Sequence, residues 1–173
     1  ASGIQCRKAS GDLWFLTNLQ HTAFQRLSTA NNSKISKIRG KFFADEDNFY
    51  RKNIKNKIVL VAGSGLGNDA IRISKYNKKV VGIDILPKLV SFSEKRRKKL
   101  GIKNISFKVG DIKKLKYKNN SFDVAVLNMG TIGNFDNKAE IIKELLRACN
   151  EAYIDFYQDS KKSRGRRKKM YEE

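Results

Sequence analysis

The chain has 173 residues, which is enough for one domain with a sizeable core and too few for two comfortable ones. Its 37 Lys and Arg against 17 Asp and Glu give a net charge of +20, which favours partners that are polyanions. No run approaches the roughly 18 consecutive apolar residues of a membrane span. The N-terminus has no apolar stretch of the kind found in a secretory signal. One histidine and two isolated cysteines cannot supply the ligands of a zinc site.

The cysteines and the charge also suggest a compartment and a class of partner. Cys6 and Cys149 are the only cysteines and neither belongs to a C-x-x-C pair, so we expect two reduced thiols in a cytoplasmic protein. The charge excess is mostly lysine, in a chain rich in Ile and Asn, and an AT-rich genome produces the same bias. Charge therefore favours RNA or an RNA–protein assembly as a partner without deciding it.

Residues 1–45 are predicted to form an N-terminal helical extension. Apolar residues recur there at three- and four-residue steps, as in an amphipathic helix, and Ser10 or Asp12 could cap its start. The residues in this pattern are Leu13, Leu16, Ala23, Phe24 and Leu27. A loop follows at 29–34, and 45–53 is predicted as a short helix with Phe49 and Tyr50 on one side.

From residue 57 onward, apolar β-branched runs alternate with segments of helical spacing. The predicted strands are 58–62, 80–84, 105–109, 122–127 and 152–157, and the predicted helices are 68–76, 87–100 and 139–149. Pro87 suits the first position of its helix, and Gly101 suits the position just after it. This alternation predicts an α/β fold with a doubly wound, mainly parallel sheet of about five strands.

A glycine loop lies between the first of these strands and the helix that follows it. Gly63, Gly65 and Gly67 allow the backbone to turn sharply and to approach a ligand that a Cβ would block. The dinucleotide fingerprint requires a small residue at its sixth position, which is Asn68 here, and this disfavours a nicotinamide-dependent oxidoreductase. The loop also lacks the lysine of a P-loop.

Four segments in order resemble the motifs of class I, Rossmann-like S-adenosylmethionine-dependent methyltransferases. Residues 59–67 resemble the first motif, and the later motifs are matched by 81–84, 110–112 and 121–128. The resemblance covers roughly residues 46–157, which we expect to be the cofactor-binding domain, and it implies S-adenosylmethionine as the cofactor.

The resemblance also implies a set of cofactor-binding residues. Asp84, at the end of the second strand, would accept hydrogen bonds from both ribose hydroxyls, as in dinucleotide folds. Asp111 and Ile112 would hold the adenine, and residues 128–130 would line the methionine end. The full set is Gly63, Ser64, Gly65, Gly67, Asp84, Ile85, Asp111, Ile112, Asn128 and Met129. The structural alternatives are a strand-end acid or helix cap at Asp84 and a turn-forming acid at Asp111.

The sequence departs from the family pattern in ways that leave the reaction open. Most relatives carry an acid two residues before the first glycine, where this chain has Val61. It also lacks the Asn/Asp-Pro-Pro-aromatic motif and the cysteine nucleophile of base methyltransferases. Methyl transfer from a sulfonium needs little acid–base machinery, so these absences do not exclude an enzyme, and no catalytic residue can be named.

The end of the sequence predicts an exposed sheet edge. Class I methyltransferases close their sheet with a C-terminal antiparallel hairpin, whereas only a basic tail, 158–173, follows the fifth predicted strand here. Either this chain is a fragment, or the domain is naturally shortened, or the order of its elements is rearranged. We therefore expect a protein partner or RNA to cover the open edge.

Dense basic clusters are the candidate nucleic-acid contacts. The expected contact residues are Lys95, Arg96, Arg97, Lys161, Lys162, Arg164, Arg166 and Arg167. The alternatives are a solvated helix face for 95–99 and a solubilising end for the tail. Trp14, Phe42 and Phe43 could stack on bases, but we expect them to pack in the core instead.

These patterns lead to one preferred function and one rival. The preferred function is transfer of a methyl group from S-adenosylmethionine to an acceptor, with RNA or an RNA–protein assembly as the expected target. The rival is a methyltransferase-like protein that has lost catalysis and binds RNA or serves a structural role.

Overall fold

The computed structural model describes residues 3–8, 44–128 and 131–156. Its strands are β1 (Gly3–Lys8), β2 (Ile58–Ala62), β3 (Lys79–Asp84), β4 (Ile105–Val109), β5 (Phe122–Leu127) and β6 (Cys149–Phe156). Its helices are a segment over residues 44–53, α3 (Asn68–Ser74), α4 (Pro87–Lys99), the short 3-10 helix η2 (Thr131–Asn134) and α5 (Lys138–Ala148). The helix predicted within residues 13–27, Met129 and the basic tail lie outside the described residues.

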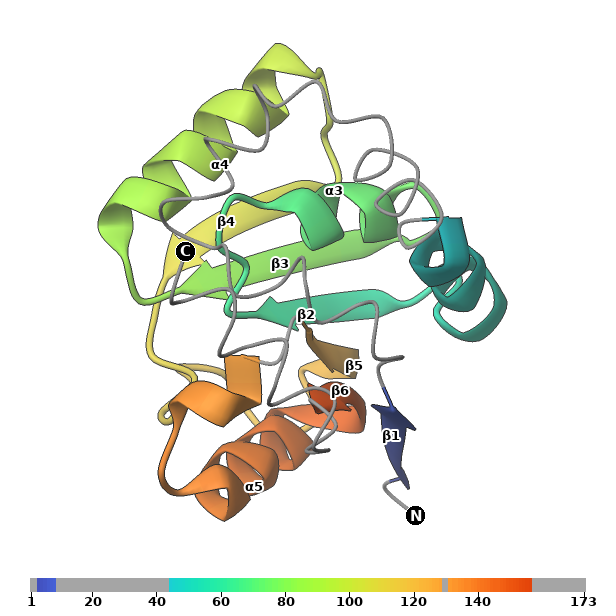
Figure 1. Cartoon of the computed structure of the whole chain (residues 1–173). Helices are drawn as coiled ribbons and strands as arrows, with labels where there is room; N and C mark the ends of the chain where they lie inside the picture. Colours follow the sequence, from blue (N-terminus) through green and yellow to red (C-terminus); the bar gives the residue numbers. More distant parts are fainter. Residues whose placement is uncertain (1–2, 9–43, 129–130, 157–173) are drawn as a thin grey trace, which may run out of the picture.

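All six strands are parallel and lie in the order β1-β6-β5-β2-β3-β4 (Figure 1). The chain runs from β2 outward to β3 and β4, and then returns to place β5 and β6 on the other side of β2. The prediction of a doubly wound parallel sheet is confirmed. The strand order reverses between β2 and β5, and ligands of such sheets bind outside the carboxyl ends of the strands at this point.

The sequence does not predict the sixth strand, β1. Its residues pair in parallel with β6, from Gly3 beside Glu151 to Lys8 beside Phe156. β1 comes from the segment that the sequence assigns to a helical extension, and its apolar–polar alternation covers only residues 4–7. Since β1 covers β6, the sheet edge on this side lies at β1, one strand further out than the sequence indicates.

Helices cover both faces of the sheet and bury two apolar clusters (Figure 1). The helix over 44–53, α3 and α4 cover one face, and α5 covers the other. The first cluster includes Tyr50, Ile54, Ile73, Val80, Phe107 and Val126, and the second includes Leu60, Ile83, Phe122, Leu127, Ile141 and Leu145. Each fully buried large aliphatic side chain contributes about 1.5–3 kcal/mol to folding, so these clusters fix the helices on the sheet.

The two faces are completed differently at the β4 end of the sheet. The segment between β4 and β5 contains no helix, and α5 holds it in place instead. Glu144 accepts the backbone N–H of Leu115 at 2.7 Å, and Arg147 donates to the carbonyl oxygen of Tyr117 at 2.8 Å. Within the ranges that the structure covers, no helix is both long enough and apolar enough to cross a membrane.

Candidate functional site

The strand register brings the predicted site residues to one edge of the sheet. Ala62 lies beside Ile83 in the β2–β3 pair, and Asp84 lies beside Val109 in the β3–β4 pair. Since Val61 lies beside Val126, β5 ends at the same level. The loops that follow these four strands, which carry Gly63–Gly67, Asp84, Asp111 and Asn128, therefore leave the sheet at its carboxyl edge, as the sequence predicts.

The glycine loop has the left-handed backbone that its sequence requires. Gly63, Gly65 and Gly67 have φ angles of 65°, 52° and 78°. A Cβ on Gly65 would meet no atom within 4 Å, so the space above this residue is open. A Cβ on Gly67 would lie 2.7 Å from Cζ of Phe107, so this glycine also allows β4 to pack close to the start of α3. The hydroxyl of Ser64 is buried and has no hydrogen-bond partner among the described residues.

Helix α4 holds this loop from the side. Ser93, which is fully buried, donates from its hydroxyl to the carbonyl oxygen of Gly65 at 3.0 Å. Arg96 donates to the carbonyl oxygen of Leu66 at 3.2 Å and to the side-chain oxygen of Asn68. Arg96, which the sequence suggests as a nucleic-acid contact, is thus part of the support of the glycine loop.

The other two predicted nucleic-acid contacts in α4, Lys95 and Arg97, have different surroundings in the structure. Arg97 forms an ion pair with Glu94 at 2.9 Å and donates to the carbonyl oxygen of Ile102 at 2.9 Å. Lys95 is exposed and forms no ion pair with a described residue. The structure therefore leaves Lys95 open to a partner and gives the two arginines structural contacts.

Asp84 connects the glycine loop to the end of β3. Its carboxylate accepts the N–H of Gly65 at 2.8 Å on one oxygen and the N–H of Leu86 at 3.0 Å on the other. The side chain is mostly buried, with the residue 8% exposed. Asp84 therefore has the structural role of a strand-end acid that was considered as its alternative. The carboxylate can still bind a ligand, because each oxygen can accept a second hydrogen bond.

The residues expected around the adenine lie in contrasting environments. Asp111 is exposed and accepts the N–H of Lys113 at 2.8 Å, which is the turn-forming role considered as its alternative. Ile112 is 5% exposed and its side chain packs in the core, so only its backbone is placed to meet a ligand. Ile85 is 63% exposed and supplies apolar surface beside Asp84.

A buried polar network surrounds Asn128 at the end of β5. The side-chain amide of Asn128 donates to Glu46 at 2.7 Å, to the hydroxyl of Tyr50 at 2.9 Å and to Asp69 at 3.2 Å. Glu46 and Tyr50 belong to the helix over 44–53, and Asp69 belongs to the first turn of α3. The network therefore joins three elements next to the glycine loop.

Arg72 is the cation of this network. It donates to Glu46 and to Asp69, the latter at 2.8 Å, and lies 3.5 Å from Asp47. Three carboxylates thus surround one guanidinium. Burial and the negative charge of Asp69 raise the pKa of Glu46 to about 7, although the contacts with Arg72 and Asn128 act in the opposite direction.

Sequence reasoning missed all of this network except Asn128. Glu46 and Tyr50 are four residues apart, and Asp69 and Arg72 are three apart, so each pair shares a helix face. These spacings are also typical of solvated helix faces. Nothing in the sequence shows that the two helices meet at the end of β5.

The glycine loop, the acid after the neighbouring strand and the reversal of strand order define a Rossmann-like α/β domain, a fold in which ligands bind at the carboxyl edge of the sheet. Residues 53–162, more than half of the chain, match the family model for a methyltransferase domain, and the chain belongs to this family. The resemblance to class I methyltransferases is thereby confirmed.

Two curated relatives are similar to part of the chain. The chain is 33% identical over 97 residues to norajmaline N-methyltransferase from Rauvolfia serpentina, which is 55% of this chain and 33% of the relative. It is 27% identical over 106 residues to the release factor glutamine methyltransferase of Buchnera aphidicola, which is 60% of this chain and 38% of the relative. The chain thus spans little more than a third of the length of these relatives.

A solved structure shows the same fold over most of the chain. The PH0226 protein from Pyrococcus horikoshii superposes with a TM-score of 0.67 at 20% sequence identity. The match covers 93% of this chain and 72% of that protein. At this identity the likeness establishes the architecture alone.

The environment of Glu46 predicts a pH-dependent stability. Its folded-state pKa of about 7 lies above its ordinary value of 4.5, so the folded protein binds this proton more strongly than the unfolded chain. The free energy of unfolding should therefore fall as the pH rises from 4.5 through about 7. Glu46→Gln removes the titrating group and keeps an oxygen that can accept from Asn128. The free energy of unfolding of this variant, measured with urea, should therefore depend more weakly on pH.

The comparison is between the pH slopes of the free energy of unfolding for the wild type and for the variant, which share every other titrating group. Identical slopes would show that Glu46 does not gain a proton on folding.

Proposed function

We propose that this chain is the cofactor-binding domain of a methyltransferase that uses S-adenosylmethionine. The observation that carries the proposal is the hydrogen bond from Gly65 to Asp84, which joins the glycine loop and the strand-end acid at the carboxyl edge of the sheet. Bound there, the cofactor would supply an electrophilic methyl group on a sulfonium, and the protein would position the acceptor.

The residues at this edge fit the cofactor. The open space above Gly65 allows close approach of a ligand to the backbone. The free acceptor positions on Asp84 suit ribose hydroxyls, and the exposed side chain of Ile85 offers an apolar surface to a base. Asp111 is exposed and follows Gly110, whose N–H donates to the carbonyl oxygen of Asp84 at 3.0 Å.

The methionine end of the cofactor would lie toward Asn128. Asn128 is held by Glu46, Tyr50 and Asp69, so its position is fixed before a ligand arrives. A side chain held in this way contributes to orientation, which is the main task of a protein in methyl transfer. We assign Asn128 a positioning role and name no general base.

RNA, or an RNA–protein assembly, is the proposed acceptor. The net charge of +20 supports a polyanionic substrate. The names of the two curated relatives give different acceptors, norajmaline in one case and a release factor glutamine in the other. Similarity to these relatives therefore does not determine the acceptor. A cytoplasmic location and a protein partner along the sheet edge stay predictions.

A methyltransferase-like protein without catalysis is the second candidate. The observation that favours it is Val61, which is buried in the apolar cluster at the position where most relatives carry an acid. Cofactor binding and methyl transfer therefore need separate experiments.

Replacement of Asp84 tests the cofactor site. Asp84→Ala removes the acceptors proposed for the ribose and the support of Gly65, so its affinity for S-adenosylhomocysteine should fall by at least about tenfold in a calorimetric titration. Asp123→Ala is the matched control, because Asp123 also accepts a backbone N–H, that of Ile58 at 2.7 Å, but at the opposite edge of the sheet. Its affinity should equal that of the wild type.

Equal affinities of the Asp84→Ala and wild-type proteins would leave Asp84 with a structural role only. Heat with NAD and none with either sulfur-containing ligand would contradict the proposed cofactor.

Methyl transfer is tested with radiolabelled S-adenosylmethionine and separate pools of total RNA, total protein and small molecules. We expect the label to enter RNA, and to do so much more slowly with Asp84→Ala, because that variant binds the cofactor weakly. Label in protein or in small molecules would contradict the proposed acceptor. Cofactor binding with no label in any pool would favour the second candidate.

A further inference from the structure

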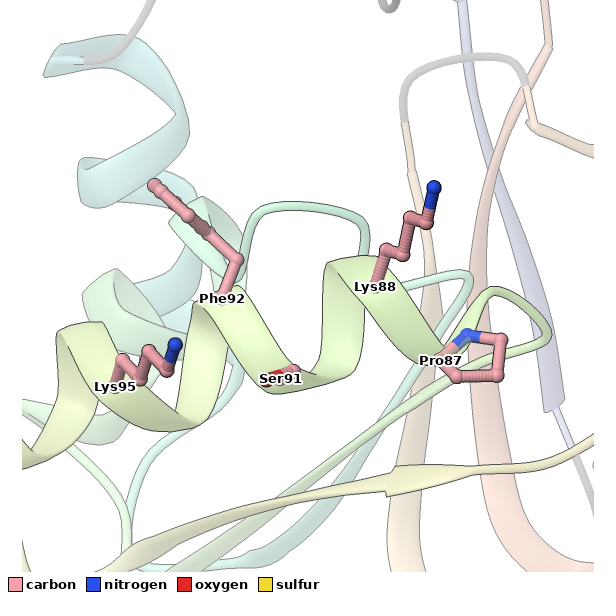
Figure 2. A pocket seen from close by; sticks show the side chains of 5 residues that line it. All are labelled: Pro87, Lys88, Ser91, Phe92 and Lys95. Carbon is pink, nitrogen blue, oxygen red and sulfur yellow. The ribbon is translucent and has the colours of Figure 1, made fainter.

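Helix α4 carries a stripe of cationic and aromatic side chains on its outer face. Lys88, Phe92, Lys95 and Lys99 follow one another at steps of four, three and four residues, which places them on one side of a helix. Figure 2 shows Lys88 and Phe92 projecting from one side of α4, with Lys95 further along the helix. We call these four residues the α4 stripe.

The α4 stripe lies opposite the buried side of the helix. Val90 and Ser93 face the sheet and are buried, whereas all four residues of the stripe are exposed and Phe92 is 50% exposed. A shallow hollow surrounds Phe92 on this face, and its lining residues are Pro87, Lys88, Ser91, Phe92 and Lys95 (Figure 2). The ring therefore lies in a place where a flat ligand group can reach it.

The lysines of the stripe are free to bind an anion. None of Lys88, Lys95 and Lys99 forms an ion pair with a described residue. Arg96 and Arg97 in the same helix are engaged, Arg96 with the glycine loop and Arg97 with Glu94. The helix therefore separates its cations into arginines that hold the fold and lysines that face solvent.

The charge around the stripe has one sign. Residues 88–118, which include α4, β4 and the segment after β4, contain twelve Lys and Arg and two acids. Residues 119–156, which include β5, α5 and β6, contain three Lys and Arg and six acids. A second cavity beside β4 is lined in part by Lys108, Lys114 and Lys116. The field of the protein thus directs a polyanion to the α4–β4 end of the sheet.

We propose that the α4 stripe binds single-stranded RNA, with a base stacked on Phe92 and phosphates in contact with Lys88, Lys95 and Lys99. An aromatic ring between cations is the arrangement that binds single strands, because every unpaired base offers a face for stacking. A duplex keeps its bases stacked inside and gives Phe92 nothing to contact. An anionic membrane requires a broad apolar helix face, and the stripe has one apolar residue among three lysines.

The position of α4 connects this surface with the candidate cofactor site. The helix begins three residues after Asp84, and Ser93 and Arg96 on its inner side hold the glycine loop. The stripe extends from Lys88 to Lys99, about 16 Å at 1.5 Å per residue. A single strand of RNA bound along the α4 stripe therefore reaches the carboxyl edge of the sheet. The inference rests on the proposed function only where it treats the bound RNA as the methyl acceptor. RNA binding by the α4 stripe can be tested without the cofactor.

The test measures binding of the full chain to a fluorescent oligouridylate, to an RNA duplex of the same length and to vesicles containing phosphatidylserine. Phe92→Ala should weaken oligouridylate binding by about tenfold and leave duplex binding unchanged, because only an unpaired base stacks on the ring. Lys88→Gln/Lys95→Gln/Lys99→Gln should reduce the slope of log affinity against log salt by about 2, at about 0.7 per phosphate contact on a single strand. Lys75→Gln/Lys78→Gln/Lys143→Gln, which changes three exposed lysines outside α4, is the matched control and should keep the wild-type slope.

Oligouridylate binding by Phe92→Ala equal to that of the wild type would overturn the proposal. Equal weakening of single-strand and duplex binding, or tighter binding to vesicles than to the oligonucleotide, would do so as well. S-adenosylhomocysteine titrations of the same variants separate this inference from the proposed function. Stripe-dependent RNA binding without cofactor binding would contradict the proposed function alone, and cofactor binding without stripe-dependent RNA binding would contradict the inference alone.

Discussion

The hydrogen bond from the N–H of Gly65 to Asp84 is the contact on which the candidate site depends. It fixes the left-handed turn after β2 against the end of β3, and the second oxygen of Asp84 fixes the turn that leads into α4. Helix α4 returns two contacts to the same loop through Ser93 and Arg96. Loop, strand end and helix therefore form one unit, and a ligand at this edge meets a backbone that is already in place.

A second constraint acts on the other side of the glycine loop. Buried polar groups require partners, and Asn128 finds them in the helix over 44–53 and in α3. Glu46 shares Arg72 with Asp69, so the helix that precedes β2 is connected to the loop by charge as well as by apolar packing. The two ends of the candidate site are thus organised differently, with backbone donors to Asp84 and side-chain acceptors around the amide of Asn128.

The parts that the sequence predicts are those with local patterns. Five strands, their parallel order and the meeting of Gly63–Gly67, Asp84, Asp111 and Asn128 follow from alternating elements and turn chemistry. β1 alternates apolar and polar residues over only four positions, and the Glu46–Arg72 contact joins segments 26 residues apart, so neither has a strong local signal. The α4 arginines show the limit of composition, because a run of cations does not reveal which of them have partners within the fold.

The central claim is that S-adenosylmethionine binds at the carboxyl edge of β2 and β3. A crystal structure of the chain grown with S-adenosylhomocysteine tests it most directly, because the nucleoside, the ribose and the amino-acid end can be placed separately. We expect the ribose hydroxyls within hydrogen-bond distance of Asp84, the adenine against Ile85 and the amino-acid end toward Asn128. A nucleoside bound elsewhere, or a ribose without contact to Asp84, would contradict it.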